Sequence, residues 1–302
     1  MTSKPILIGF ACAIAATILW SGNFIVARGL SDVIAPLSLA FWRWVVAILV
    51  LLPFAIKPLL AQKSWLKENV GYLSIVSLLG VTLFNSLIYY AGQTSSAINL
   101  SLIAITFPIF ILILSRIFMA EAIGWNKLGG IVLVAAGILL LISKGKVSVL
   151  TELTFSQGDI WMLLASLIFA IYSMLLKRKP IGISVPAFQL ASFSLGFLFL
   201  LPLYLLELYF IPAQSIESST AMSILYIGIF ASLFAFILWN KAIAIIGAVN
   251  AGMVYYSLPI FSGILAIIIL DEAVTSLHLY STLLVLAGIL MAVIYPPKQV
   301  RS

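Results

Sequence analysis

The sequence is a succession of long apolar segments separated by short polar breaks. An α-helix needs about 20 predominantly apolar residues to cross a lipid bilayer. We expect ten such spans, with the bounds Ile6–Ala27, Ile34–Ile56, Val70–Ala91, Ala97–Phe118, Lys127–Ile142, Gly158–Leu176, Val185–Leu206, Thr220–Trp239, Ala248–Leu270 and Ser276–Tyr295. The breaks contain Lys, Pro, Ser and Asn clusters, which are costly to place in hydrocarbon. The pattern predicts an all-α integral membrane protein.

The composition agrees with this pattern and excludes a water-soluble globular protein. Of the 302 residues, 64% are hydrophobic and 8% are charged, whereas soluble domains average about 45–50% apolar and about 25% charged residues. The chain has one cysteine, Cys12, and one histidine, His278. These two residues cannot form an intramolecular disulfide or a multi-ligand His/Cys zinc site. We therefore expect no metal centre and no cofactor.

The second half of the chain repeats rare residues of the first half in the same order. At a constant offset of 151 the matched pairs are Asn99 and Asn250, Pro108 and Pro259, Phe110 and Phe261, Glu121 and Glu272, and Gly137 and Gly288. Earlier spans match with small shifts, as in Gly9 and Gly158. We expect two five-helix repeats, 1–146 and 147–302. Because five is odd, the second repeat enters the membrane in the opposite sense, as in many secondary transporters.

The placement of basic residues predicts the orientation of the spans. Lys and Arg collect in the cytoplasmic connections of membrane proteins. With a cytoplasmic N-terminus, twelve basic residues fall on that side: Lys4, Lys57, Lys63, Lys67, Arg116, Lys127, Lys177, Arg178, Lys179, Lys241, Lys298 and Arg301. Three fall outside, Arg28, Lys144 and Lys146. The formal net charge of +7 therefore indicates topology rather than a nucleic-acid partner, and both termini are expected in the cytoplasm.

Several short motifs recur in a fixed order through both halves. The first half contains Leu19-Trp20-Ser21-Gly22-Asn23-Phe24, Arg28, Arg43, Phe107-Pro108-Ile109-Phe110, Glu121 and Gly137, and the second contains Leu258-Pro259-Ile260-Phe261, Glu272 and Ala287-Gly288. This ordered set resembles the drug/metabolite transporter superfamily, in particular its EamA branch. The resemblance implies a carrier that moves small organic solutes, often amino acids or other metabolites, outward across the bacterial inner membrane by alternating access. It leaves the cargo open.

Arg43 is the one basic residue placed well inside a span. A guanidinium there costs at least a few kcal/mol unless it is paired or reaches water. Two roles are open: Arg43 binds a carboxylate or phosphate of the cargo in a cavity, or it bonds helix-end carbonyls or reaches outward to the interface. Its equivalent in the second repeat is Phe193. Because the fold does not require the charge twice, the binding role is slightly favoured.

Two prolines are expected to interrupt their spans. Pro108 and Pro259 each lie nine residues after an asparagine, Asn99 or Asn250, that opens the span. Proline removes a backbone donor and kinks a helix, and transporters with inverted repeats use broken helices near their binding sites. We favour a gating role for both prolines over a static kink. Glu121 and Glu272 close the same spans, and for them a helix cap or interhelix contact is favoured over proton transport.

Other polar and aromatic side chains inside the spans are candidates for lining a substrate cavity. They are Trp20, Asn23, Asn85, Tyr90, Tyr172, Gln189, Asn240, Tyr255 and Tyr256, together with Arg43, Asn99 and Asn250. For each tyrosine the alternative is an interfacial anchor, and for each amide it is a helix-to-helix hydrogen bond. The same alternatives apply to Tyr89 and Trp239, and because both lie near the predicted ends of their spans, the interfacial anchor is favoured for them over lining a cavity.

The absence of catalytic motifs favours transport over enzymatic chemistry. The sequence contains no Ser/His/Asp or Cys/His set and no paired carboxylates in mid-span. The glycines at 247 and 252 are not followed by the Lys and Ser/Thr of a phosphate loop, so no ATPase function is expected. We expect a secondary transporter, exporting small metabolites such as amino acids or analogues, with the cargo and the bilayer as its partners. The alternatives are a lipid or lipid-linked flippase, a multidrug efflux protein and, less favoured, a membrane enzyme or a receptor.

Overall fold

The computed structural model describes residues 3–119, 125–142 and 156–294, and every regular element in these ranges is a helix. The first repeat contains α1 (Ser3–Gly29), α2 (Pro36–Ala61), α3 (Lys63–Glu68), α4 (Val70–Ser77), the π-helical segment η1 (Leu78–Leu83), α5 (Phe84–Gly92), α6 (Ala97–Ala104), α7 (Phe107–Met119) and α8 (Trp125–Ile142). The second contains α10 (Gln157–Lys177), α11 (Val185–Phe210), α12 (Ser218–Tyr226), the π-helical segment η2 (Ile227–Phe234), α13 (Ala235–Tyr255), α14 (Leu258–Leu270) and α15 (Ser276–Ile294).

These elements make ten spans. Seven helical segments are long and apolar enough to cross a membrane, and three shorter apolar helices complete the set, Leu128–Gly137, Leu258–Leu270 and Ser276–Gly288. The third span combines α4, η1 and α5, and the fourth combines α6 and α7. The eighth runs through α12, η2 and the first part of α13. The ninth combines the rest of α13 with α14. The predicted all-α membrane fold of two inverted repeats is confirmed.

The eighth span is longer than the sequence pattern predicts. The predicted span ends at Trp239, but the helix continues through Asn240 and Lys241 to Gly247. There the backbone has φ 79°, in the left-handed region that glycine adopts without a steric penalty. The chain turns at Gly247 and starts the ninth span. Trp239 consequently lies about two helical turns inside the bundle, not at its end.

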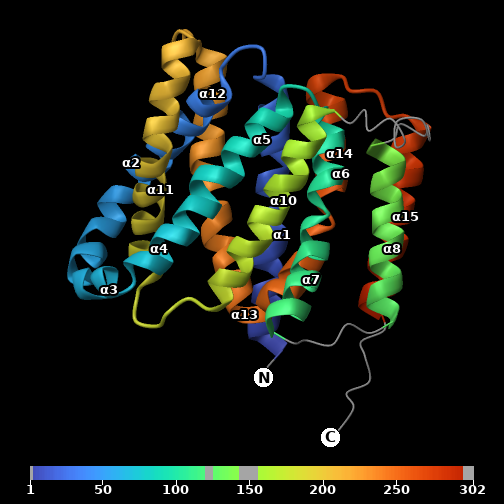
Figure 1. The fold of residues 1–302 in the computed structure, drawn as a ribbon, viewed down its shortest axis with the longest axis horizontal. Coiled ribbons are helices and arrows are strands. Elements are labelled where there is room, and N and C mark those ends of the chain that lie inside the picture. The colour runs from blue at the N-terminus through green and yellow to red at the C-terminus, as the bar shows by residue number, and fades with distance from the viewer. Residues whose placement is uncertain (1–2, 120–124, 143–155, 295–302) are drawn as a thin grey trace, which may run out of the picture.

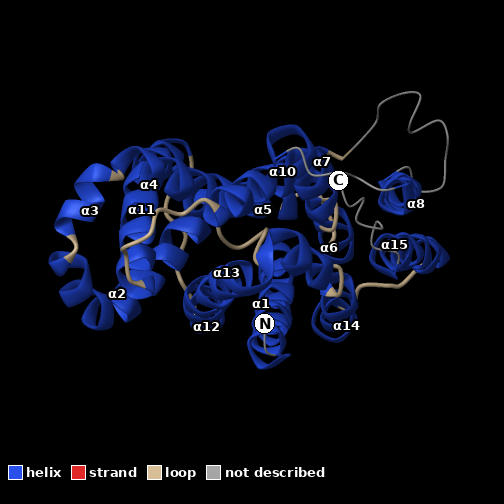
Figure 2. Ribbon diagram, turned by 90° about the horizontal axis from the view of Figure 1, so that it is seen from below, coloured by secondary structure: helices blue, strands red, loops and turns tan. Residues whose placement is uncertain are grey.

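Helix packing follows the repeat. α1 packs against α13 and α14, and α10 packs in the equivalent way against α5 and α7. α2 pairs with α11, and α8 pairs with α15, which form a separate pair at one edge of the bundle (Figures 1 and 2). The matched glycines allow α8 and α15 to approach closely. A Cβ on Gly137 would lie 2.9 Å, and one on Gly288 would lie 2.6 Å, from a carbonyl oxygen of the other helix.

The two π-helical segments occupy equivalent positions in the third and eighth spans and present free carbonyl groups to neighbouring helices. A π-bulge interrupts the regular i to i−4 hydrogen bonds. Trp44 donates its indole N–H to the Val81 carbonyl (3.0 Å), and Trp20 donates to the Ala231 carbonyl (2.9 Å). Val81 and Ala231 are 150 residues apart, close to the repeat offset. Each repeat therefore anchors a buried tryptophan at its π-helical segment.

Candidate transport centre

Six large rings meet in the middle of the bundle, one from each of the first, third, fourth, sixth, eighth and ninth spans. They are Trp20, Phe84, Phe107, Phe169, Trp239 and Tyr255, and we call this group the aromatic centre. Phe169 stacks on Phe84 with ring centroids 4.2 Å apart, and Phe107 meets Tyr255 at 5.1 Å. All six side chains are buried. The predicted candidates Trp20 and Tyr255 thus belong to a closed aromatic cluster.

The fourth and ninth spans are both interrupted beside the aromatic centre. α6 ends before Ile105 and Thr106, and α7 begins at Phe107. α13 ends at Tyr255, and α14 begins at Leu258. In each break a hydroxyl side chain donates to a carbonyl three residues earlier at 2.8 Å, from Thr106 in one span and from Ser257 in the other. The interruptions expected from the two prolines are present at equivalent positions.

The prolines themselves follow the interruptions. Pro108 is the second residue of α7, and Pro259 is the second residue of α14. Proline fits the first turn of a helix, where its missing N–H has no intrahelical partner. Pro108 also packs toward Gly252 of the ninth span, where a Cβ would lie 3.4 Å from the Pro108 Cβ. The two broken spans therefore cross close to their breaks.

Arg43 lies beside the aromatic centre, on the side away from the start of α1. Its guanidinium donates to the Asn23 Oδ1 at 2.9 Å, the Tyr89 hydroxyl at 2.8 Å and the Ala231 carbonyl at 3.0 Å, and its Nε donates to the Ser232 hydroxyl. The Tyr89 hydroxyl in turn donates to Asn23 at 3.0 Å. We call these side chains and the Ala231 carbonyl the Arg43 cluster.

In the Arg43 cluster, neutral oxygen acceptors compensate for burial of the guanidinium, and no carboxylate is among them. Arg43 is 0% exposed, and it lines none of the cavities described below. Of its two possible roles, the geometry matches hydrogen bonding to carbonyl and side-chain oxygens of neighbouring spans. Binding of a cargo anion by Arg43 would require the neighbouring spans to separate from this buried arrangement.

A second polar group lies on the other side of the aromatic centre, toward the start of α1. Asn240 donates from its amide to the Gln189 Oε1 at 2.8 Å, and Tyr172 donates its hydroxyl to the Asn240 Oδ1 at 3.3 Å. The adjacent Trp239 donates to the Ser173 hydroxyl at 3.3 Å. We call Tyr172, Gln189 and Asn240 the Asn240 cluster. Three predicted cavity candidates thus come together from the sixth, seventh and eighth spans.

The other predicted candidates are dispersed. Asn85 is buried and donates to the Gly80 carbonyl at 3.1 Å, while its Oδ1 has no partner. Tyr256 is buried at the break of the ninth span. Tyr90 is 37% exposed and faces Trp161. The buried Asn99 Oδ1 has no partner, whereas Asn250 is exposed and donates to the Ile246 carbonyl at the end of the eighth span.

Glutamates at the ends of spans bind the starts of neighbouring helices. The Glu272 carboxylate accepts the backbone N–H of Ala97 (2.8 Å) and Ile98 (3.1 Å) at the start of α6. Glu207 accepts the N–H of Leu37 (2.9 Å) and Ser38 (2.7 Å) at the start of α2. Carboxylates at helix N-termini satisfy free donors and complement the helix dipole. Glu121 lies outside the described residues.

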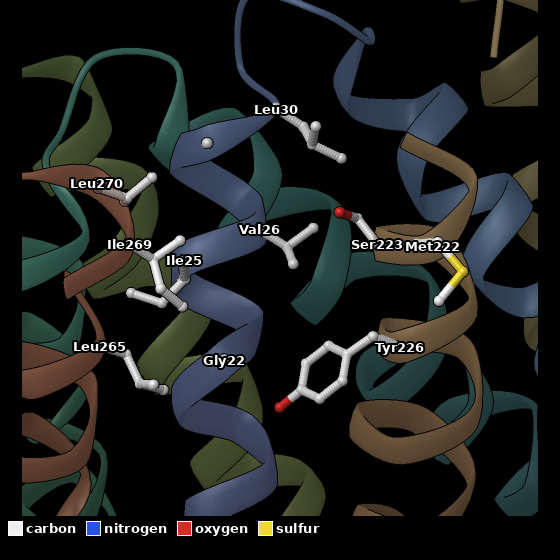
Figure 3. Close-up of a pocket in the computed structure, with 11 residues that line it drawn as sticks. Gly22, Ile25, Val26, Leu30, Met222, Ser223, Tyr226, Leu265, Ile269 and Leu270 are labelled. Atoms are coloured by element: carbon white, nitrogen blue, oxygen red, sulfur yellow. The ribbon is translucent and has the colours of Figure 1, made fainter. Parts of the chain in front are cut away.

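Two lateral grooves are related by the repeat. The larger one, about 520 Å³, lies between α1, α12 and α14, with Val26, Tyr226 and Leu265 around it (Figure 3). Its rim residues Met222 and Ile269 are 67% and 58% exposed, so this groove faces the bilayer. The smaller one, about 270 Å³, lies between α7 and α10. Their linings correspond, because Leu114 of the smaller groove is the equivalent of Leu265.

A third cavity opens where the sixth, seventh and eighth spans meet near the start of α11. It has a volume of about 470 Å³ and includes Asn240 together with two lysines, Lys179 and Lys241. We call it the two-lysine pocket. Among the described residues, no group of three or more His, Cys, Asp or Glu side chains is arranged to hold a metal ion.

Comparison with known proteins identifies the architecture. The sequence profile of the EamA-like transporter family matches residues 7–143 and 156–294. The chain belongs to the EamA-like transporter family. It is a multi-pass membrane protein of the drug/metabolite transporter superfamily, as the motif resemblance predicts.

Relatives and a solved structure cover almost the whole EamA-like chain. An uncharacterized transporter from Archaeoglobus fulgidus is 28% identical over 277 residues, which are 90% of this chain and 92% of the relative. The uncharacterized transporter YyaM of Bacillus subtilis is 24% identical over 294 residues, 97% of this chain and 94% of its own. A crystal structure with 18% sequence identity covers 97% of this chain and 98% of its own, with a TM-score of 0.66, and shares the fold.

The structure of this EamA-like transporter corrects two predictions and adds residues that the sequence did not single out. Tyr89 and Trp239 are not interfacial anchors, because they are 1% and 0% exposed and lie in or beside the centre. Ser232 and Ala231 accept from Arg43 because η2 presents them. Lys179 and Lys241 line a pocket, although the sequence showed them only as topology signals. The clustering of basic residues could have suggested an anion site.

Proposed function

We propose that this EamA-like transporter exports small organic metabolites, such as amino acids or analogues, by alternating access. The observation that carries the proposal is the pair of breaks in the fourth and ninth spans, which adjoin Phe107 and Tyr255 in the aromatic centre. A broken helix lets half of a span move while the other half stays packed. Movement at the two equivalent breaks would open the centre to one side of the membrane at a time.

The two polar clusters support this proposal because they close the centre from opposite sides. In the proposed cycle, separation of the Asn240 cluster opens the path toward the start of α1, while the Arg43 cluster keeps the other side closed. Both are held by hydrogen bonds between different spans. Each neutral hydrogen bond of the Asn240 cluster contributes about 0.5–1.5 kcal/mol net, and each hydrogen bond of the Arg43 guanidinium about 1.5–3 kcal/mol. In the proposed cycle, differential binding of cargo to the two states biases the exchange between them.

The proposal includes an orientation in the membrane. The two repeats, 1–146 and 147–302, would move against each other in the bacterial inner membrane, with both termini in the cytoplasm. The basic residues support this orientation, because Lys63, Lys67, Arg178 and Lys179 gather at the end of the bundle where α1 starts. The two-lysine pocket would then open on the cytoplasmic side, where cargo for export is loaded.

A flux measurement tests the proposal. Proteoliposomes containing the full chain are loaded with a mixed pool of amino acids and small carboxylates, and the solutes that leave are identified by mass spectrometry. We expect selective efflux that protein-free liposomes do not show and that Trp239→Ala reduces. Efflux of no solute from the pool, in vesicles where insertion of the protein is verified, would contradict the proposal.

A lipid or lipid-linked flippase is the second candidate, because the groove in Figure 3 opens toward the bilayer. Its described lining contains no charged side chain to accompany a polar head group across the membrane, so this candidate has less support. Translocation of a fluorescent phospholipid in the same vesicles distinguishes the two. Lipid translocation without metabolite efflux would favour the flippase.

A further inference from the structure

The two-lysine pocket combines an apolar wall with an unusual surplus of positive charge. It lies between the end of α10, the start of α11 and α13, and Phe188 and Ile237 belong to its lining. Lys241 is exposed and Lys179 is half-buried. The described lining contains no carboxylate. A cavity with two cations and no acidic group attracts an anion.

Neither lysine has a partner of opposite charge among the described residues. The Lys179 ammonium lies 5.0 Å from the centroid of the Phe188 ring, a cation–π contact. Burial lowers the pKa of Lys179 from its ordinary value, because partial removal from water disfavours the charged form. This cation is thus partly desolvated without the ion pair that would compensate for it. An anion bound in the pocket would supply that compensation.

The pocket adjoins the proposed transport path. Asn240 lines the pocket and at the same time holds the Asn240 cluster through Gln189 and Tyr172. The next residue along the chain, Trp239, contacts Trp20 in the aromatic centre with ring centroids 5.2 Å apart. A solute in the pocket is therefore separated from the centre by one layer of hydrogen-bonded side chains.

We propose that the two-lysine pocket is the loading site of the transporter and that it selects solutes with an anionic group, carboxylate or phosphate, on an apolar body. Lys179 and Lys241 bind the anionic group, while Phe188 and Ile237 contact the apolar part. This inference rests on the proposed export function and specifies its substrate class. Because the described lining offers no carboxylate to an ammonium group, a simple carboxylate is preferred over the zwitterion with the same side chain.

The test compares three probes with the same branched apolar body: 4-methylpentanoate, its amide 4-methylpentanamide, and the zwitterion L-leucine. Binding to the full chain in phosphatidylcholine nanodiscs is measured by calorimetry. We expect the carboxylate to bind at least about tenfold tighter than the amide, a preference of the size that one charge-assisted hydrogen bond provides, with L-leucine between them. Lys179→Gln and Lys241→Gln should each reduce the preference, and the double variant should abolish it.

Lys67→Gln is the matched control. Lys67 is exposed in α3 at the same end of the bundle and lines none of the described cavities, so the preference should survive its replacement. Equal affinity for acid and amide, undetectable binding of the acid, or an unchanged preference in the double lysine variant would each overturn the inference.

A lipid phosphate has the same chemistry as the proposed cargo group, so a second arm adds phosphatidylglycerol to the nanodiscs. The lipid head group is the occupant if phosphatidylglycerol displaces 4-methylpentanoate from the wild type and the double lysine variant no longer binds phosphatidylglycerol. In that case the loading role is wrong. The binding assay is independent of flux. Charge-selective binding without efflux would contradict only the proposed export, and efflux without charge selectivity would contradict only this inference.

Discussion

Trp20 and Phe169, which occupy equivalent positions in the two repeats, meet edge to face with ring centroids 5.3 Å apart. This contact lies where the repeats face each other, so it links them directly. Trp20 also donates to the Ala231 carbonyl of η2. One side chain therefore joins the aromatic centre to the π-helical segment that supports Arg43.

Replacement of Trp20 tests the importance of this contact. Trp20→Ala should destabilise the protein by about 3–5 kcal/mol, as expected for removal of a large buried ring, and should lower the thermal unfolding midpoint in detergent. Ile18→Ala is the control, because Ile18 is on the same helix and 44% exposed, and its replacement should have a small effect. Similar midpoints for the two variants would show that the aromatic centre does not hold the repeats together.

Much of the fold was predictable, because the length of each apolar segment and the recurrence of rare residues in both halves can be found directly in the sequence. The interruptions of the fourth and ninth spans directly precede Pro108 and Pro259. Proline alone does not locate a break, because Pro53 and Pro202 lie inside continuous helices.

Tyr89 lies near the end of α5, as predicted, but its side chain turns inward to Arg43 and Asn23 instead of lying at the interface. Trp239 was placed wrongly because a helix end cannot be located from a polar pair alone. Asn240 and Lys241 suggested an end where the helix continues to Gly247, and this moved Trp239 from the expected interface to the centre.

Two acceptors of Arg43, the Ala231 carbonyl and the Ser232 hydroxyl, were not predictable for a different reason. They belong to the π-helical segment η2, which interrupts the regular helical hydrogen bonds and packs against α1 and α2. No sequence motif marks that geometry. The same holds for the two-lysine pocket, which combines residues from three spans that are distant in sequence.

Arg43→Gln should impair stability rather than cargo selection. Removing the guanidinium leaves buried acceptors such as the Ala231 carbonyl without a donor, at about 1–3 kcal/mol per group. We expect a clear fall in the unfolding midpoint and an unchanged preference for 4-methylpentanoate over its amide. Arg116→Gln, at an exposed position, should change neither the unfolding midpoint nor the preference for 4-methylpentanoate. A lost preference with an unchanged midpoint would instead place Arg43 in contact with cargo.

Glu207 should stabilise the bundle through the start of α2. Its carboxylate accepts two backbone N–H groups and the Ser38 hydroxyl, and replacement of a helix-capping side chain by alanine costs about 0.5–2 kcal/mol. Glu207→Ala should therefore lower the unfolding midpoint. Glu217→Ala provides the comparison, because Glu217 is exposed and makes no side-chain cap. Equal unfolding midpoints for Glu207→Ala and Glu217→Ala would indicate that water replaces the Glu207 carboxylate without loss of stability.

The inverted repeat makes a topological prediction. A reporter fused after Ser302 should be cytoplasmic, and one inserted in the connection 144–157 should be external, because five spans separate the two points. Paired enzymatic reporters that are active on only one side of the membrane measure this directly. Finding both reporters on the same side would contradict the orientation proposed for the second repeat.

The breaks beside the aromatic centre should control the rate of transport. In both broken spans a proline is the second residue of the second half-helix, so replacement by alanine restores a backbone donor and favours a continuous helix across the break. Pro108→Ala and Pro259→Ala should therefore slow efflux several-fold while changing probe affinity much less. Pro53→Ala is the matched control, since Pro53 lies inside α2, is exposed and lies away from both breaks. If both variants transport at the wild-type rate, the breaks are static features of the fold and the movement must occur elsewhere.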